Sequence, residues 1–185
     1  DGYILDEDGI SGEKVDYLLE LRGSGKNICA PYAEKYPNAK FFAGKKPWEV
    51  KADLYIPCAT QNEIKIEDAE AIVKQGVKYV VEVSNMPCTN DAIACMQKAG
   101  IVMAPSKAVN AGGVAVSALE MSQNSMRLSW SEEEVDQKLQ GIMKDIYKKI
   151  DDAAQRYDMK DNFVVGANIA GFEKVVEAMI SQGIY

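Results

Sequence analysis

The sequence predicts an α/β protein, in which a wound parallel sheet is followed by a C-terminal α-helical extension. Two observations predict this fold. Short apolar runs rich in β-branched and aromatic residues alternate with helical patterns, and this order of strand, helix, strand, helix is typical of a parallel sheet. Beyond residue 110 the apolar residues recur at helical spacing, which indicates helices.

Four buried strands are expected, each bounded by polar or turn residues. They cover residues 39–43, 53–57, 77–83 and 101–104. Helices are expected between them at 66–75 and 90–99. Each of these two patterns ends at a glycine, Gly76 or Gly100, that suits a left-handed C-cap.

Helices are also expected on both sides of this region. Residues 13–22 and 31–36 have helical patterns separated by the breaker Gly23-Ser24-Gly25, and they would pack on the flank of the sheet. After the last strand, a helix is expected to start within residues 110–113.

The C-terminal part is predicted to be helical throughout. Ser131 and Glu134 form a capping box that opens a long helix. The apolar seam of this helix comprises Val135, Leu139, Ile142, Ile146, Ile150, Ala153 and Tyr157. A final helix is expected at 169–182. The predicted domains are therefore a sheet domain, 1–128, and C-terminal helices, 129–185.

Composition and charge exclude several classes of protein. A chain of 185 residues with 47% hydrophobic residues is long enough for one domain with a real core. The net charge of −7 disfavours a broad nucleic-acid or acidic-membrane surface, and no apolar run is long enough to cross a bilayer. We therefore expect a cytoplasmic protein that binds neither nucleic acid nor membrane.

Histidine and cysteine limit the chemistry. The chain contains no histidine, which removes Ser/His/Asp and Cys/His catalysis and the commonest ligand of transition metals. Its cysteines, Cys29, Cys58, Cys88 and Cys95, show no CxxC and no spacing typical of a zinc site. Reduced, mostly buried thiols and no metal site are therefore expected.

Polar and small residues follow three of the strands, at the carboxyl ends where a parallel wound sheet binds ligands. These segments are residues 57–62, 84–87 and 105–113. Their amides and hydroxyls suit the ribose hydroxyls and the carboxamide of a dinucleotide, because they add no charge that must be desolvated. The same residue types form turns and caps in any α/β protein, so a purely structural role stays open.

The glycine-rich phosphate turn of dinucleotide-binding folds, GxGxxG after a first strand, does not occur in the sequence. Gly23-Ser24-Gly25 follows a helical pattern and is interpreted as a plain loop. The sequence also begins at Asp1 without an initiator Met. Both observations favour a fragment that begins after the first βαβ turn.

Motifs in these loops and beyond carry a resemblance to a known family. They are Pro47-Trp48, Pro57-Cys58-Ala59-Thr60-Gln61-Asn62-Glu63, Asn85-Met86-Pro87, Ala104-Pro105, Lys107-Ala108, Asn110-Ala111-Gly112-Gly113-Val114-Ala115-Val116-Ser117, Leu119-Glu120-Met121 and Gly166-Ala167-Asn168-Ile169-Ala170-Gly171-Phe172. In this order they resemble the coenzyme-binding, C-terminal domain of the hexameric bacterial-type glutamate dehydrogenases, along essentially the whole chain. The resemblance implies a Rossmann-like sheet that lacks its first βαβ turn.

The resemblance implies reversible oxidative deamination of L-glutamate to 2-oxoglutarate and ammonia in a homohexamer, with hydride transfer to NAD or NADP. Its cofactor-binding residues would be Ala59, Thr60 and Asn62 along the nucleotide path. Asn85 would meet the ribose nearest the nicotinamide, and Asn110 would meet the carboxamide.

The resemblance also implies substrate-binding residues. Val114 and Ser117 would face the substrate, and Ser117 would donate to its side-chain carboxylate, as suits a hydroxyl near a helix start. Ser117 could equally bond back to its own helix. The family's catalytic lysine and aspartate lie in an N-terminal substrate domain, so no catalytic residue is assigned here and the isolated chain is expected to be inactive.

The sequence departs from the family pattern in two places. At Val83-Ser84 the family more often has Gly-Ala, and at Ser106 it usually has Gly. We expect the bulkier Val83 to shift the backbone near the ribose.

Two alternative functions stay open. The first is a dehydrogenase for leucine, phenylalanine or valine, although an apolar substrate needs no hydroxyl at Ser117 for a second carboxylate. The second is a non-catalytic nucleotide-binding domain that begins at Asp1.

Overall fold

The computed structural model describes residues 1–25 and 28–183 of the chain. The chain divides into two compact units, Asp1–Val50 and Lys51–Tyr185. The predicted boundary at residue 128, between a sheet domain and C-terminal helices, stays a prediction.

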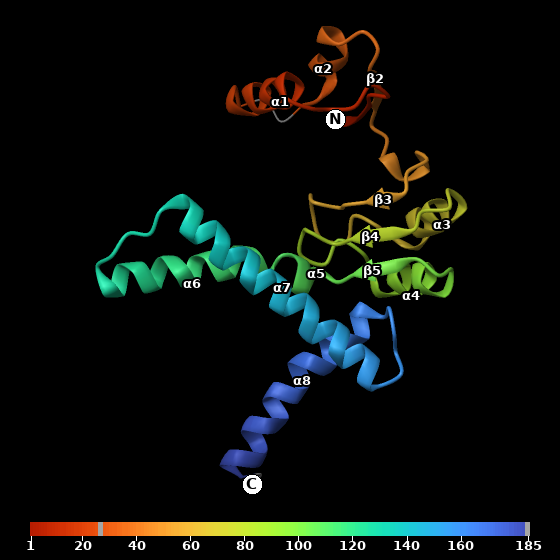
Figure 1. The fold of residues 1–185 in the computed structure, drawn as a ribbon. Helices are drawn as coiled ribbons and strands as arrows, with labels where there is room; N and C mark the ends of the chain where they lie inside the picture. Colours follow the sequence, from red (N-terminus) through yellow and green to blue (C-terminus); the bar gives the residue numbers. More distant parts are fainter. Residues whose placement is uncertain (26–27, 184–185) are drawn as a thin grey trace. The chain divides into compact units, whose positions relative to one another are not determined.

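The first unit is a small antiparallel sheet flanked by helices (Figure 1). Its elements are β1 (Gly2–Leu5), α1 (Glu13–Gly23), α2 (Ala30–Lys35), β2 (Lys40–Ala43) and the 3-10 turn η1 (Pro47–Glu49). Across the sheet, Tyr3 stacks on Phe42 with ring centroids 4.7 Å apart. α2 packs against both strands and buries Tyr32.

The strand expected at residues 39–43 is confirmed, but its place in the parallel sheet is wrong. It pairs antiparallel with β1, a strand that the sequence pattern did not predict. β1 is only four residues long and opens on Gly2, and so short a run with a glycine carries little strand signal. The glycine is needed there, because a Cβ would overlap the Phe42 carbonyl group.

The second unit contains the parallel sheet and most of the helices (Figure 1). Its elements are β3 (Leu54–Tyr55), α3 (Ile66–Lys74), β4 (Tyr79–Val81), α4 (Asn90–Lys98), β5 (Val102–Ala104), α5 (Ser106–Val109), α6 (Ala111–Met126), α7 (Glu132–Arg156) and α8 (Phe163–Gln182). The strands pair in the order β3, β4, β5 and all run parallel, so the predicted wound parallel sheet is confirmed.

The core of this sheet lies on the side of α3 and α4. Tyr55, Val80 and Met103 are buried, whereas their neighbours Leu54 and Tyr79 on the other face are more than 40% exposed. The helices contribute the buried residues Ala69, Ile72, Ala92 and Met96. Both helices are followed by glycines in the left-handed region, with φ of 71° at Gly76 and 84° at Gly100, as predicted.

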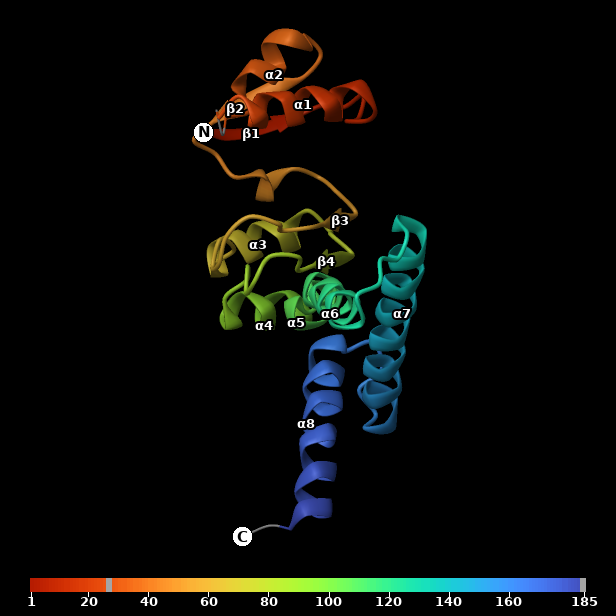
Figure 2. The same ribbon diagram turned by 90° about the vertical axis from the view of Figure 1, so that its left-hand side faces the viewer.

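Among the C-terminal helices, α7 packs against both α6 and α8, and α8 also contacts β5 (Figure 2). The predicted capping box is confirmed, since the Ser131 hydroxyl accepts from Glu134 N–H at 3.3 Å and the Glu134 carboxylate accepts from Ser131 N–H at 2.9 Å. The predicted seam of α7 is half-buried or buried, except Tyr157, which lies past the helix end and is exposed. None of the helices among the described residues is long and apolar enough to span a membrane.

The last helix begins at Phe163 and not at residue 169 as predicted. Asn162 opens it, because its side chain accepts from Val165 N–H at 3.1 Å. Gly166 inside the helix marks a close crossing, since a Cβ there would overlap the Ile150 carbonyl oxygen of α7. A glycine that suggests a loop in the sequence therefore serves helix packing.

The cysteines are free thiols, but the prediction that they are mostly buried is wrong. Only Cys88 is buried, whereas Cys58 is exposed and Cys29 and Cys95 are half-buried. Cys58 is exposed because it lies in the loop that follows β3, at the carboxyl edge of the sheet.

Candidate functional site

The loops that follow β3 and β4 are joined by backbone hydrogen bonds. Asn62 N–H donates to the Met86 carbonyl at 2.9 Å, and Val83 N–H donates to the Pro57 carbonyl at 3.1 Å. Asn62 and Met86 both adopt left-handed backbone, with φ of 53° and 49°. The polar segments that the sequence places after these two strands therefore meet at one edge of the sheet.

The loops that follow β4 and β5 are joined by a pair of amides. Asn110 Nδ2 donates to Asn85 Oδ1 at 2.7 Å. Asn110 precedes α6, but its side chain makes no capping hydrogen bond there. Among the described residues, the Asn85 amino group and the Asn110 carbonyl oxygen have no protein partner, so each can bond a ligand while the amides stay paired.

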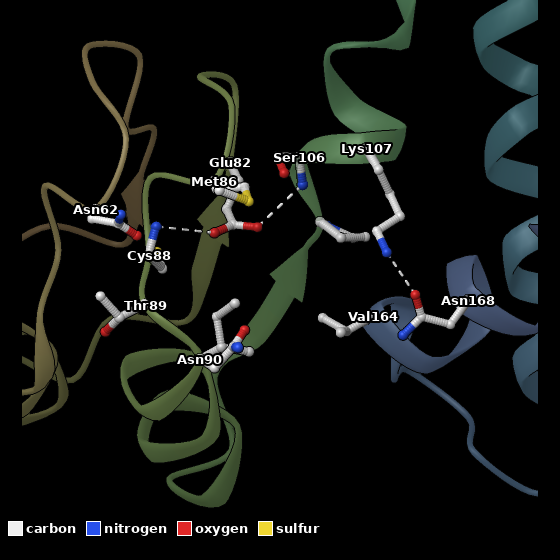
Figure 3. Close-up of a pocket in the computed structure, with 12 residues that line it drawn as sticks. Asn62, Glu82, Met86, Cys88, Thr89, Asn90, Ser106, Lys107, Val164 and Asn168 are labelled. Atoms are coloured by element: carbon white, nitrogen blue, oxygen red, sulfur yellow. Dashed lines mark hydrogen bonds between the residues drawn. The ribbon is translucent and has the colours of Figure 1, made fainter.

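A pocket of about 460 Å³ lies at the same edge (Figure 3). It is bounded by the loops after β4 and β5, by the start of α4 and by the first turns of α8. Its polar lining includes Asn62, Thr89, Asn90, Lys107 and Asn168. Together with the carboxylate of Glu82, these amides, the hydroxyl and the ammonium suit a polar ligand, as expected for the nucleoside portion of a dinucleotide.

Lys107 connects the pocket to the last helix. Its Nζ donates to Asn168 Oδ1 at 2.6 Å, which ties α5 to α8 (Figure 3). Lys107 and Asn168 are both exposed. The contact gives the lysine a structural role, and no carboxylate among the described residues pairs with it.

Glu82 is the buried carboxylate of the pocket, with 3% of its surface exposed. Its Oε1 accepts from Cys88 N–H at 3.3 Å, and its Oε2 accepts from Ser106 N–H at 3.1 Å (Figure 3). Burial, together with the nearby Glu82 carboxylate, raises the pKa of the Cys88 thiol far above its ordinary value. Cys88 is therefore a neutral thiol and not a nucleophile.

The structure places the predicted cofactor residues in different positions. Asn62 lines the pocket, whereas Asn85 and Asn110 bond each other and are not among its lining residues. Ala59 and Thr60 are exposed in the loop after β3 and do not line the pocket, although Ala59 N–H donates to the Glu63 carboxylate at 3.3 Å.

The predicted substrate residues lie apart from the pocket, on the first turns of α6. Val114 is 71% exposed, and Ser117 is also exposed. The Ser117 hydroxyl donates to the Gly113 carbonyl at 3.3 Å, which is the bond back to its own helix that the sequence left open. The structure thus presents both side chains at an open surface.

The departures from the family pattern lie beside these loops. Val83 is 36% exposed, and Val83 N–H and Ser84 N–H both bond the Pro57 carbonyl at 3.1 Å. The Ser84 hydroxyl is buried and has no partner among the described residues. The expected shift of the backbone at Val83 stays a prediction.

Sequence reasoning did not identify Glu82, Thr89, Asn90 or Asn168 as members of the site. Glu82 had a usable signal, because a charged residue within the apolar run Val80-Val81-Glu82-Val83 must find partners when the strand is buried. The other three had none, since polar residues near a helix start are expected as caps.

Comparison with known proteins identifies the family. The family model described as Glutamate/Leucine/Phenylalanine/Valine dehydrogenase matches residues 1–183. The chain belongs to this family. Its fold is confirmed by a solved glutamate dehydrogenase that superposes with a TM-score of 0.93 at 54% identity, covering 100% of this chain and 41% of that chain.

Two curated relatives define the likeness more closely. The chain is 56% identical to the NAD-specific glutamate dehydrogenase of Bacteroides fragilis, over 100% of its own length. It is 47% identical to the NADP-specific glutamate dehydrogenase of Giardia intestinalis, over 98% of its own length. In both cases it spans 41% of the relative. The resemblance drawn from the loop motifs is confirmed.

Proposed function

We propose that this chain is the coenzyme-binding part of a glutamate dehydrogenase, which converts L-glutamate reversibly to 2-oxoglutarate and ammonia with NAD or NADP. The observation that carries the proposal is the amide pair Asn85 and Asn110 at the carboxyl edge of the parallel sheet. Such an edge is where wound sheets bind dinucleotides. Relatives named NAD-specific and NADP-specific glutamate dehydrogenase support this choice of substrate and coenzyme.

The amide pair would hold the nicotinamide end of the coenzyme, and the coenzyme itself would carry the hydride. The Asn110 carbonyl oxygen would accept from the carboxamide, and the Asn85 amino group would donate to a ribose hydroxyl. Their mutual hydrogen bond fixes both amides before the coenzyme binds. Ala59, Thr60 and Asn62 would line the rest of the nucleotide path.

The start of α6 would bind the substrate. Val114 and Ser117 lie three residues apart on this helix, and both are exposed. The Ser117 hydroxyl would leave the Gly113 carbonyl and donate to the side-chain carboxylate of glutamate. The catalytic lysine and aspartate of the family would come from the substrate domain, so the 185-residue chain alone would not turn over glutamate.

The test is glutamate-dependent reduction of NAD and of NADP by the natural protein that contains this chain at full length. We expect turnover with glutamate, well above that with leucine, and none with the isolated chain. Replacing Ser117 by alanine should lower kcat/KM for glutamate by about tenfold to a hundredfold, because a hydrogen bond to a charged group is lost.

The matched control is Ser122→Ala. Ser122 lies on the same helix and donates to the Ala118 carbonyl at 2.9 Å, so its removal deletes the same kind of helix bond without touching the substrate. Equal effects of the two substitutions would contradict the role of Ser117. Absence of turnover with both coenzymes would favour the non-catalytic alternative, and preference for leucine would favour another amino-acid dehydrogenase.

A homohexamer in the cytoplasm is part of the same proposal. It is supported by the resemblance to the hexameric glutamate dehydrogenases. Light scattering on the full-length protein tests the assembly, since it distinguishes a hexamer from a monomer or dimer by mass.

A further inference from the structure

The Glu82 carboxylate joins the loop after β4 to the turn after β5, and its backbone N–H also donates to the Ala104 carbonyl at 3.0 Å. One oxygen accepts from Cys88 N–H at 3.3 Å and the other from Ser106 N–H at 3.1 Å. No lysine or arginine among the described residues pairs with it. The Glu82 carboxylate, in a residue that is 3% exposed, is therefore held by a backbone donor at each oxygen, with the Cys88 thiol as a neighbouring side-chain partner.

The two loops that Glu82 joins are the loops that carry the amide pair. Asn85 lies between Glu82 and Cys88 in the chain, and Asn110 directly follows α5, which begins at Ser106. The Asn85–Asn110 bond of 2.7 Å is a second link between the same loops. Figure 3 shows the Glu82 carboxylate between Cys88 and Ser106, with a dashed line to each.

We propose that Glu82 is a positioning residue, which holds the loops of Asn85 and Asn110 at the separation that the nicotinamide end of the coenzyme requires. This inference rests on the proposed function. A carboxylate suits the task because both of its oxygens accept, whereas an amide of the same shape can accept on one side only. Both oxygens already accept from backbone N–H groups, so the proposed role is that of a hydrogen-bond acceptor.

The first test is Glu82→Gln in the full-length protein. Its new amino group would face one of the two N–H donors, so the loops would separate. We expect the Kd for the reduced coenzyme, measured by its fluorescence, to rise about tenfold. The KM for the coenzyme should rise with it, while kcat and the pH profile change little. Glu70→Gln, on the exposed side of α3, is the matched control and should bind coenzyme as the wild type does.

The second test keeps Glu82 and removes one of its donors. Ser106→Pro deletes the N–H that Glu82 Oε2 accepts. Proline is tolerated there because Ser106 is the first residue of α5 and Pro105 before it has extended backbone, with φ −74° and ψ 144°. This variant should also weaken coenzyme binding about tenfold.

The double variant separates a direct link from two unrelated effects. In Glu82→Gln with Ser106→Pro, the glutamine oxygen can accept from Cys88 N–H and its amino group no longer faces a donor. We therefore expect the double variant to bind coenzyme no worse than either single variant. Additive losses, or a reduced Tm with an unaltered Kd, would overturn the proposal.

A role in proton transfer would give a different pattern. In that case Glu82→Gln would lower kcat strongly and change the pH profile, with the coenzyme Kd unaltered, and the positioning role would be wrong. Coenzyme binding and glutamate turnover by the wild type are measured first. If both occur, the variants decide the role of Glu82 alone; if neither occurs, the proposed function and this inference fail together.

Discussion

Each unit of the chain holds a carboxylate away from solvent, and the two are stabilised in different ways. Asp6 in the first unit has a side chain that is 1% exposed, and it accepts from Lys14 Nζ at 2.8 Å and from the Tyr32 hydroxyl at 2.5 Å. Glu82 in the second unit accepts from backbone N–H groups. Side-chain partners make the first carboxylate part of a network that holds distant segments of its unit together. Because its partners are backbone N–H groups of two loops, the Glu82 carboxylate links those loops to each other.

The difference between the two carboxylates extends to titration. Hydrogen bonds from Lys14 and Tyr32 lower the pKa of Asp6, and the bond from Lys14 raises the pKa of that lysine in turn. Burial, with the bond to Asp6, raises the pKa of Tyr32 to about 12. The network in the first unit therefore contains groups whose pKa values are shifted in opposite directions, downward for Asp6 and upward for Lys14 and Tyr32.

The largest effect is expected for Asp6→Ala. If this variant lost no protection, the contrast between the two carboxylates would be wrong. The change leaves the Lys14 ammonium and the Tyr32 hydroxyl without their shared acceptor, so residues 1–50 should lose protection in hydrogen exchange. Residues of the parallel sheet should keep theirs. Glu20→Ala on the exposed side of α1 is the control. Unchanged protection in Asp6→Ala would show that the network does not hold the unit.

The close approach of Gly166 to Ile150 is a backbone contact in the second unit that involves no charge, so it can be compared with the carboxylate network of the first unit. Gly166→Ala puts a Cβ against the Ile150 carbonyl oxygen, so α7 and α8 must move apart. We expect a loss of about 1–3 kcal/mol in the free energy of unfolding. Gly171→Ala in the same helix meets no atom and should instead stabilise the protein by up to about 1 kcal/mol. Chemical denaturation measures both, and equal effects would rule out the close crossing.

The pH dependence of the first unit follows from the shifted pKa values. Because the folded pKa of Asp6 is lowered, its contribution to stability is present above the unfolded value of 3.8 and is lost as pH falls through the folded value. Because the folded pKa of Tyr32 is raised, its contribution is present below 10.0 and is lost as pH rises towards about 12. Ultraviolet absorbance of tyrosinate should show a late step that Tyr32→Phe removes. A titration identical in that variant would contradict the network.

The smallest effect is expected at the start of α7. Ser131→Ala removes the hydroxyl that accepts from Glu134 N–H and should cost about 1 kcal/mol. Ser129→Ala, two residues earlier on an exposed position, is the control and should be neutral. Thermal unfolding of the two variants tests whether the capping box stabilises the protein. Equal Tm values would show that it does not.

Local signals explain which parts of the fold the sequence could predict. The glycines after α3 and α4 and the capping box at Ser131 act within a few residues, so their effects are visible in the sequence. The pairing of β1 with β2 depends on segments far apart in the chain, and no local pattern contains it. Gly166 resembles a loop residue until the helix that crosses it is known.

For the candidate site, too, local features were predictable from the sequence and contacts between distant segments were not. The loops after the strands were identified because strand ends and polar residues are both local, and Asn85 and Asn110, from two of these loops, do bond each other. Asn168 and Lys107 are brought into contact by the last helix, across a long stretch of chain. Glu82 could have been recognised from its place in an apolar run, but its partners depend on the fold of both loops.

The most direct test of the central claim is a crystal structure of the full-length protein with reduced coenzyme bound. We expect the nicotinamide carboxamide to lie against Asn110 and its ribose against Asn85, with the Glu82 carboxylate still bonded to Cys88 N–H and Ser106 N–H. A nicotinamide bound away from the two asparagines would contradict the assignment of the site.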